Sequence, residues 1–313
     1  PSPGDPPPSA RAEPVCSEVT AETAVSFPDA NLEHAIRAAL HVGDDQALTC
    51  AVLSRLTSLH APDAGIQDLT GIENLVGLTE LYVYGNNSIQ DVTPLGFLPA
   101  LTDLSLARNE IEDIGPLAQL RTLTSLDLLG NPIRDISPVG SLTGLTRLRL
   151  ANIPQLADLD ALRGLGALTR LELGGNAIVD IRPLASLTRL TRLSLQDNPR
   201  LTDVGPLGHL LDLETLSLGG TAVSDLRALG GLSRLTTLGL EDTRVGELGP
   251  LLGLAALSRV DLRGNMQLSD IHALLFHPAL GAGDAVRVED SGVTCTDVAA
   301  LETKGVTVVS TCR

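Results

Sequence analysis

One repeated frame constrains the fold of this chain more than any other feature of its sequence. A unit of 22 or 23 residues, Leu-x-x-Leu-x-Leu-x-x-Asn-x-Ile-x-Asp-Ile-x-Pro-Leu-x-x-Leu, recurs in register along most of the 313 residues. Its ten copies start at Leu56, Leu78, Leu101, Leu123, Leu145, Leu168, Leu190, Leu213, Leu235 and Leu257, and a degenerate eleventh start follows at Leu280. Such self-similarity indicates stacked structural repeats, in which each unit buries its apolar face against its neighbours.

The positions of the frame predict the local structure of each repeat. In the unit that starts at Leu101, the alternation of Leu104, Ser105 and Leu106 has the period of two of a β-strand, so the leucines are expected to point inward and the serine outward. The stacked strands then form a parallel sheet. The Asp-Ile-x-Pro-Leu segment is too short for a full α-helix, and its Pro suits the first turn of a short helix. We therefore expect 3-10 or extended return segments, and a shallow arc with the strands on its concave side.

The Asn that follows each strand is expected to form a buried ladder of hydrogen bonds. A buried turn leaves backbone groups without partners, and a short amide supplies both donors and an acceptor. The ladder position is occupied by Asn86, Asn109, Asn131, Asn176, Asn198 and Asn265, whereas Ile153, Thr221 and Thr243 interrupt it.

One acidic residue per repeat also recurs at a single position of the frame. These residues are Asp68, Asp91, Asp113, Asp135, Asp158, Asp180, Asp203, Asp225, Glu247 and Asp270, which are 10 of the 38 acids and contribute most of the formal net charge of −16. A calcium site uses closely alternating oxygen ligands within one loop, which this spacing does not supply. An acid beside a tight turn more often accepts bonds from nearby backbone N–H groups, and we expect that structural role here.

Charge and motif content exclude several classes of function. A net charge of −16 argues against a nucleic-acid partner and against general attraction to anionic lipid. No apolar stretch approaches the roughly 18 residues of a membrane-spanning helix. The six histidines are scattered over different repeats, and no P-loop, GxSxG or HExxH motif is present. We therefore expect no catalytic centre, no metal site and no cofactor.

The four cysteines fall into two pairs that bracket the ends of the repeat array. Cys16 and Cys50 lie before the repeats, and Cys295 and Cys312 lie after them. None forms a CxxC motif or stands at zinc-ligand spacing beside a histidine. Two disulfides, one at each end, would indicate an oxidising compartment. Buried free thiols are the alternative.

The sequence predicts four segments. Residues 1–15 are rich in Pro and are expected to form a disordered linker that serves as a tether. Residues 16–55 are expected to form a helical N-terminal cap, residues 56–279 the ten repeats, and residues 280–313 a C-terminal cap.

Each cap is expected to cover the exposed leucines at one end of the array. In the first cap, Leu32 and Ile36 share a helix face, and Gly43 is a natural stop for that helix. In the second cap, Thr296 is the expected N-cap of a helix over 297–304, which a strand at 306–309 follows.

The outward positions of the expected strands contain the candidate binding residues. Adjacent strands are about 4.8 Å apart, so Arg147, Arg149, Arg170 and Arg192 should cluster across three strands and could bind carboxylates or phosphates. Alternatively, these arginines pair with Asp127, Glu172 and Asp197 and keep the surface soluble. Both tyrosines lie on the same face, which suits an interaction hot spot. The candidate concave-face ligand-binding residues are Tyr82, Tyr84, Asp103, Asp127, Leu129, Arg147, Arg149, Arg170, Glu172 and Arg192.

Over about residues 26–280 the frame resembles the internalin class of bacterial leucine-rich-repeat proteins. The repeat spacing, the Asn and the Asp-Ile-x-Pro-Leu segment all match that class. Residues 27–37 are similar to the helical cap that precedes internalin repeats, and residues 69–73 to the first-repeat signature. The resemblance implies a right-handed α/β solenoid with a parallel sheet on its concave face. It also implies a protein that is attached to or secreted from bacterial cells and that binds a protein partner through that face.

These observations predict a non-catalytic, monomeric recognition module that binds an unidentified protein ligand. The expected location is the periplasm, the cell surface, with or without a lipid anchor, or the extracellular space. Two alternatives stay open: a structural or scaffolding repeat protein of the cell envelope, and an intracellular regulatory scaffold with reduced cysteines.

Overall fold

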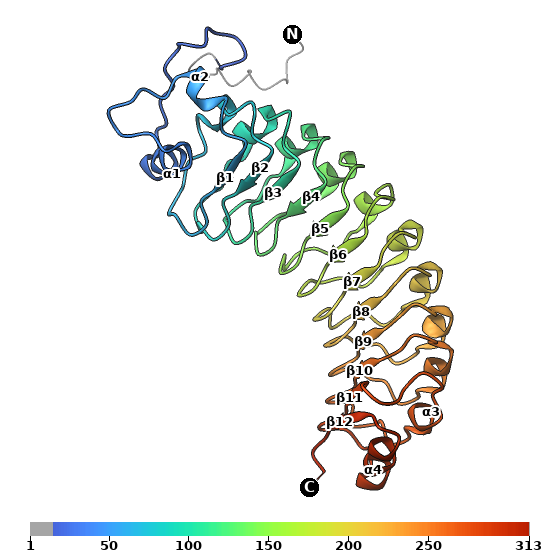
Figure 1. Ribbon diagram of the computed structural model, residues 1–313. Coiled ribbons are helices and arrows are strands. Elements are labelled where there is room, and N and C mark those ends of the chain that lie inside the picture. Colours follow the sequence, from blue (N-terminus) through green and yellow to red (C-terminus); the bar gives the residue numbers. More distant parts are fainter. Residues whose placement is uncertain (1–14, 313) are drawn as a thin grey trace.

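The chain forms a curved solenoid in which the strands line the concave side and short helices line the convex side (Figure 1). The computed structural model describes residues 15–312, so the linker expected at 1–15 lies outside the described residues apart from Val15. Twelve strands form one open parallel sheet, in which each strand pairs with the next along the chain. The expected solenoid fold is therefore confirmed.

Each strand contains three residues, and ten of the twelve belong to the ten repeats. The strands are β1 (Ser58–His60), β2 (Glu80–Tyr82), β3 (Asp103–Ser105), β4 (Ser125–Asp127), β5 (Arg147–Arg149), β6 (Arg170–Glu172), β7 (Arg192–Ser194), β8 (Thr215–Ser217), β9 (Thr237–Gly239), β10 (Arg259–Asp261), β11 (Ala285–Arg287) and β12 (Thr307–Val309).

The return segments form the expected 3-10 helices, with Pro in the first turn of six of them. They are η1 (Ile72–Asn74), η2 (Thr93–Phe97), η3 (Gly115–Gln119), η4 (Ser137–Ser141), η5 (Asp160–Leu162), η6 (Arg182–Ser186), η7 (Gly205–His209), η8 (Arg227–Gly231) and η9 (Gly249–Gly253).

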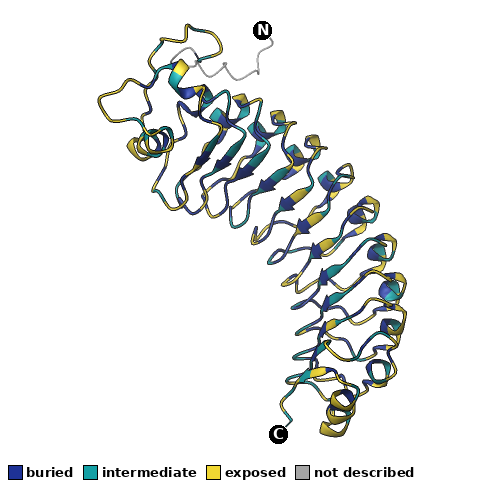
Figure 2. Ribbon diagram, viewed as in Figure 1, coloured by how far each residue is buried: buried dark blue, intermediate teal, exposed yellow. Residues whose placement is uncertain are grey.

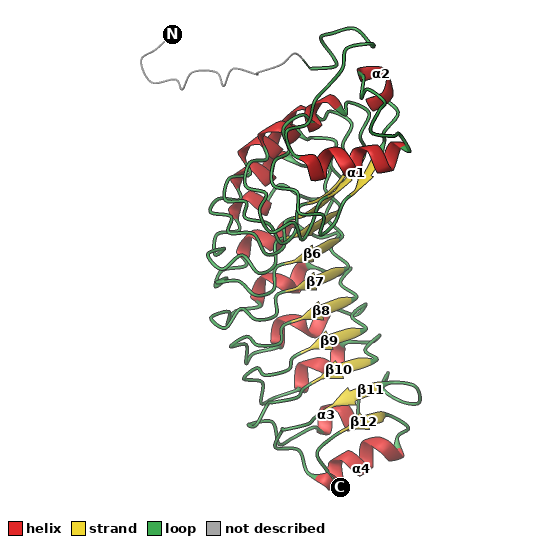
Figure 3. Ribbon diagram, turned by 90° about the vertical axis from the view of Figure 1, so that its left-hand side faces the viewer, coloured by secondary structure: helices red, strands yellow, loops and turns green. Residues whose placement is uncertain are grey.

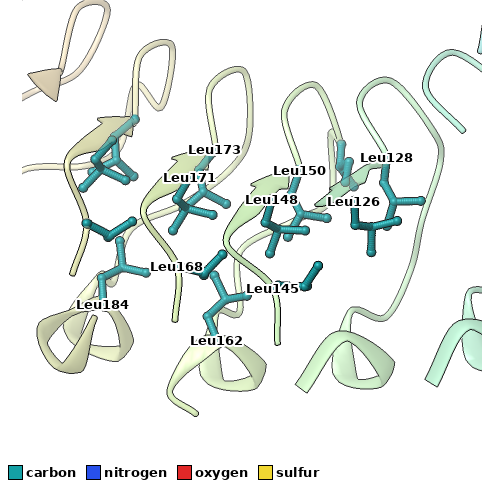
Figure 4. Packing of buried hydrophobic residues seen from close by; sticks show 14 of the residues in the cluster. Leu126, Leu128, Leu145, Leu148, Leu150, Leu162, Leu168, Leu171, Leu173 and Leu184 are labelled. Carbon is teal, nitrogen blue, oxygen red and sulfur yellow. The ribbon is translucent and has the colours of Figure 1, made fainter. Parts of the chain in front are cut away.

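A continuous leucine core fills the space between the strands and the 3-10 helices. The middle residue of each strand points inward, and Leu148 and Leu171 are each only 1% exposed. Leu162 of η5 and Leu184 of η6 meet them from the convex side (Figure 4). Buried residues occur in every repeat from one end of the arc to the other (Figure 2). Successive side chains of a strand point to opposite faces of the sheet. The first and third residues of each strand therefore lie on the concave face, opposite the buried middle residue.

The asparagine ladder is present and explains how the turns are satisfied. Asn131, which is 1% exposed, donates through Nδ2 to the carbonyls of Leu106 and Leu128 at 2.9 and 3.1 Å. Its Oδ1 accepts from the N–H of Ile111 at 3.1 Å. Asn86, Asn176, Asn198 and Asn265 bond in the same way.

Asn109 is the exception in this ladder, because its buried Oδ1 has no partner among the described residues. The preceding repeat is longer by one residue at this point: two residues separate Asn86 from the next apolar residue, Ile89, whereas one residue separates Asn109 from Ile111.

The acidic position of the frame has the structural role that we expected. In nine of the ten repeats the Asp carboxylate accepts a bond from the N–H two residues later, as Asp113 does from Gly115 at 2.7 Å. Within the described part of the chain, no group of three or more His, Cys, Asp or Glu side chains is placed to hold a metal ion.

Another periodicity, which the sequence analysis missed, spans two repeats. The residue directly before each ladder position alternates between glycine and a larger residue along the repeats. All of these residues have positive φ: Asp63, Gly85, Arg108, Gly130, Asn152, Gly175, Asp197, Gly220, Asp242, Gly264 and Asp290. A Cβ atom on Gly175 would lie 2.0 Å from Asn152 Oδ1, and one on Gly264 would lie 2.0 Å from Asp242 Oδ1. At Asp63, Asn152, Asp197 and Asp242 the larger side chain therefore occupies the space that a Cβ atom on the glycine of the next repeat would need.

Helices α1 (Ala30–Leu40) and α2 (Cys50–Leu53) cover the first repeat. Asp29 joins α1 to the array: one carboxylate oxygen caps the helix at the N–H groups of Asn31 and Leu32, and the other accepts from those of Gln67 and Asp68. Burial alone would raise the pKa of Asp29, but these four bonds outweigh burial and lower it. Helix α1 ends at His41, two residues before the predicted Gly43, because His41 itself adopts the left-handed conformation with φ of 58°.

Helices α3 (His272–Leu275) and α4 (Cys295–Thr303) close the other end (Figure 3). Helix α4 starts earlier than the helix expected after Thr296, because Thr294 is the N-cap and its hydroxyl accepts from the N–H of Asp297. Strands β11 and β12 continue the sheet beyond the ten repeats, and the expected final strand at 306–309 corresponds to β12. β11 belongs to the degenerate unit after Leu280.

Both disulfides are present, one in each cap. Cys16 bonds to Cys50 and Cys295 bonds to Cys312, with Cα–Cα distances of 5.4 Å in both cases. No free cysteine is found among the described residues. The alternative of buried free thiols is therefore wrong for this structure.

A buried histidine in the C-terminal cap predicts a pH dependence of stability. His277 is 1% exposed; its Nε2 donates to the carbonyl of Leu251 and its Nδ1 accepts from the N–H of Ala279. Burial and the nearby Lys304 ammonium lower the pKa of His277 despite the bond to Leu251. Because the pKa is lowered in the folded state, the stability that neutral His277 contributes is present above about pH 6.5 and is lost as the pH falls below that value.

We therefore expect the melting temperature of the wild type to fall more steeply between about pH 6.5 and pH 5 than that of His277→Gln. Differential scanning calorimetry across this range checks the expectation. His209→Gln, at an exposed histidine of η7, is the matched control and should follow the wild type. Parallel pH profiles for wild type and His277→Gln would contradict the assignment.

Candidate protein-binding site on the concave face

A groove of about 540 Å³ lies on the concave face over strands β2 to β6. The structure places eight of the ten predicted site residues in its lining: Tyr82, Tyr84, Asp127, Leu129, Arg147, Arg149, Arg170 and Glu172. Asp103 and Arg192 lie beside it, on β3 and β7. The groove also includes Ala107, Arg108 and Ser125, which the sequence analysis did not single out.

Strand register explains why these residues come together. Arg147 of β5 is the direct partner of Arg170 of β6, which in turn is the partner of Arg192 of β7. Arg149 of β5 stands between Asp127 of β4 and Glu172 of β6 in the neighbouring row. The regular repeat length keeps equivalent positions aligned, so residues 22 or 23 positions apart in sequence become neighbours.

Two of the four arginines are neutralised within the sheet. Arg149 binds Asp127 at 2.9 Å and Glu172 at 2.7 Å. Burial would lower the pKa of Arg149, but these two carboxylates raise it overall. Arg147 reaches across β4, where Ser125 is short, and binds Asp103 of β3 at 3.3 Å.

The other two arginines are free. Arg170 and Arg192 are exposed and form no ion pair with any residue in 15–312. Asp197, which the alternative interpretation offered as a partner, forms no ion pair with a described arginine either. Arg108 is likewise exposed and free of ion pairs within this range, and its left-handed backbone holds it at the rim of the groove over Gly130. The alternation of glycine and larger residues at its position was the sequence signal for this placement.

Aromatic side chains form the N-terminal end of the groove, and Arg170 lies at its other end. Tyr82 packs against His60 with ring centroids 4.4 Å apart. Burial, together with the negative charges of Asp103 and Glu80, raises the pKa of Tyr82 above its ordinary value. Tyr84 is 40% exposed and Leu129 is half-buried, so both offer apolar surface to a ligand.

The C-terminal part of the concave face is arranged differently. Asp261 of β10 binds Arg263 at 2.8 Å and Arg287 at 3.6 Å, and Arg287 also binds Glu289 at 2.7 Å. These charges satisfy one another. Arg259, also on β10, is exposed without an ion pair to a described residue, and it lies outside the groove.

Open curvature, one strand per repeat and an aligned concave face define a leucine-rich-repeat solenoid. A family model described as leucine-rich repeats (2 copies) matches residues 99–140, 121–164 and 167–209. An internalin (inlF) from Listeria monocytogenes is similar over 91% of this chain and 90% of its own, with 30% sequence identity and a TM-score of 0.76. The chain therefore belongs to the internalin family.

A second solved structure shares the fold. The functional domain of InlJ from Listeria monocytogenes, which includes a cysteine ladder, is similar over 88% of this chain and 68% of its own, with 24% identity and a TM-score of 0.58. No curated protein matches the sequence. None of the helices within residues 15–312 has the length and hydrophobicity that a membrane crossing requires.

Proposed function

We propose that this protein is an exported, non-catalytic recognition module that binds a protein partner through its concave sheet. The observation that carries the proposal is the groove itself, where free arginines and exposed apolar side chains lie together on a preformed surface. Rigid, aromatic- and arginine-containing patches of this kind are typical of interaction hot spots. Groups arranged for nucleophilic or metal chemistry do not converge there among the described residues.

Two observations support export to the periplasm, the cell surface or the extracellular space. Both disulfides close segments of the caps, and such bonds persist in oxidising compartments. Membership of the internalin family supports the same location. Thiol titration checks the location of the protein. The protein is isolated from its native source and unfolded in denaturant without reductant, and free thiols in that material would favour the intracellular scaffold instead.

Site-specific photocrosslinking tests the binding face. A benzophenone amino acid placed at Ser194, on β7 beside Arg192, is expected to form adducts with a protein partner in envelope and secreted fractions. The same group at Gln119, which is exposed on η3 of the convex side, is the matched control and should form none. Equal adducts at both positions would indicate nonspecific contact, and adducts at neither would favour an envelope scaffold without a dedicated ligand on this face.

A further inference from the structure

We propose that Arg170 and Arg192 bind acidic side chains of the partner protein, beside an apolar side chain of the same segment that packs on Tyr84 and Leu129. This inference rests on the proposed function, because it specifies the chemistry of the surface that the concave face recognises. The ligand class is a polypeptide segment with a few carboxylates next to an apolar anchor.

The charge of the groove selects acidic groups. Its lining contains four arginines, Arg108, Arg147, Arg149 and Arg170, and two acids, Asp127 and Glu172, which leaves a net charge of +2 in a chain whose formal charge is −16. Both lining acids are already bound by Arg149. The positive charge that remains available therefore belongs to free guanidinium groups, and a carboxylate is the protein group that binds guanidinium with two parallel hydrogen bonds.

Arg170 and Arg192 form the centre of this positive surface. They are paired in register on adjacent strands, which places their backbones about 4.8 Å apart. Arg147, the third member of the row, binds Asp103 on β3, and no described carboxylate forms an ion pair with Arg170. Two exposed, unpaired like charges held this close gain from the approach of an anion, which relieves their mutual repulsion.

The distance between the two ends of the site suggests the length of the segment. From Leu129, beyond the end of β4, to Arg170 of β6 is four positions along the strand direction and two strands across, which is about 16 Å. An extended segment of about five residues spans that distance. An apolar residue on Tyr84 and Leu129 and an acidic residue on Arg170 then fit one continuous strand-like or irregular segment.

A uniformly anionic polymer fits the surface less well than such a segment. Glu80 and Asp103 lie on the N-terminal side of the groove, and the whole chain is strongly acidic. A polyanion long enough to cross the face would place its own charges over these carboxylates. A few acids at one end and an apolar group at the other avoid that repulsion.

Fluorescence anisotropy with defined peptides tests the proposal. The probe is a labelled peptide with a phenylalanine at one end and two glutamates at the other, separated by about four Gly and Ser residues; its partner probe has glutamines in place of the glutamates. We expect the glutamate peptide to bind at least tenfold more tightly than the glutamine peptide, and Arg170→Glu/Arg192→Glu to abolish that difference. Arg259→Glu, at the free arginine outside the groove, should bind like the wild type.

Several results would overturn the proposal. These are equal binding of the two peptides, no measurable binding of the glutamate peptide at millimolar concentration, or equal losses in the Arg259→Glu and Arg170→Glu/Arg192→Glu variants. Tighter binding of poly-glutamate or heparin than of the peptide would assign the site to polyanions instead. Arg170→Gln/Arg192→Gln and circular dichroism establish that any loss comes from charge and not from misfolding. If adducts still form at Ser194 while the glutamate peptide fails, the proposed function stands and only the acidic chemistry is rejected.

Discussion

Replacement of Cys16 and Cys50 by serine is expected to lower the free energy of unfolding by about 4 kcal/mol. The bond joins residues 34 positions apart, so its loss releases a long loop in the unfolded chain. It also frees the segment before α1, where the N–H of Cys16 donates to Oδ1 of buried Asn74 at 2.8 Å. Chemical denaturation measures the total effect.

The loss should be local, because each repeat contacts only its neighbours. Amide hydrogen exchange is expected to speed up in α1, β1 and β2 and to stay slow in β6 and β7. Cys295→Ser/Cys312→Ser is the matched control: it opens a shorter separation of 17 residues, should cost about 3 kcal/mol, and should loosen α4 and β12 instead. Uniform loss of protection along the chain in either variant would contradict this nearest-neighbour description.

Asn131→Ala is expected to destabilise the protein by about 3 kcal/mol, because it leaves one buried donor and one buried acceptor without their side-chain partners. These groups are the N–H of Ile111 and the carbonyl of Leu128, whereas the carbonyl of Leu106 still accepts from Nδ2 of Asn109. Equilibrium denaturation in urea, with an unchanged slope, measures the effect.

Asn109→Ala is the comparison that isolates the cause. The Oδ1 atom of Asn109 already lacks a partner among the described residues, so its loss removes bonds from Nδ2 only. We expect this variant to lose about half as much stability as Asn131→Ala. Equal losses at the two positions would mean that side-chain volume, and not the hydrogen bonds of Oδ1, determines how much each ladder asparagine contributes to the free energy of unfolding.

The concave face shows why fold and function separate in this chain. The repeats specify a rigid surface, whereas the residues displayed on it determine the partner. Leucines at the inward positions are interchangeable between repeats. The outward positions differ from one repeat to the next, and the groove combines the free Arg108 and Arg170 with the apolar surface of Tyr84 and Leu129.

Much of the fold followed from the sequence because its signals are local and repeated ten times. The strand alternation, the Asn and the Asp-x-x-Pro segment each act within a few residues, and every copy reinforces the others. The predicted boundaries of the cap helices were less accurate. Helix α1 ends at His41 and not at Gly43, and the N-cap of α4 is Thr294 and not Thr296. Each cap occurs once, and several residues in it satisfy the same preference.

The sequence by itself determined the solenoid, its inward leucines, its hydrogen-bonded turns and the row that contains Arg147, Arg170 and Arg192. Only the tertiary structure decided which of these arginines are available to a ligand. Arg147 finds Asp103 two strands away and Arg149 finds a carboxylate on either side, whereas Arg170 and Arg192 find none among the described residues. The physical reason is that ion pairing depends on the direction of long side chains and on the size of the residue between them, such as Ser125, and neither quantity is encoded in the repeat period.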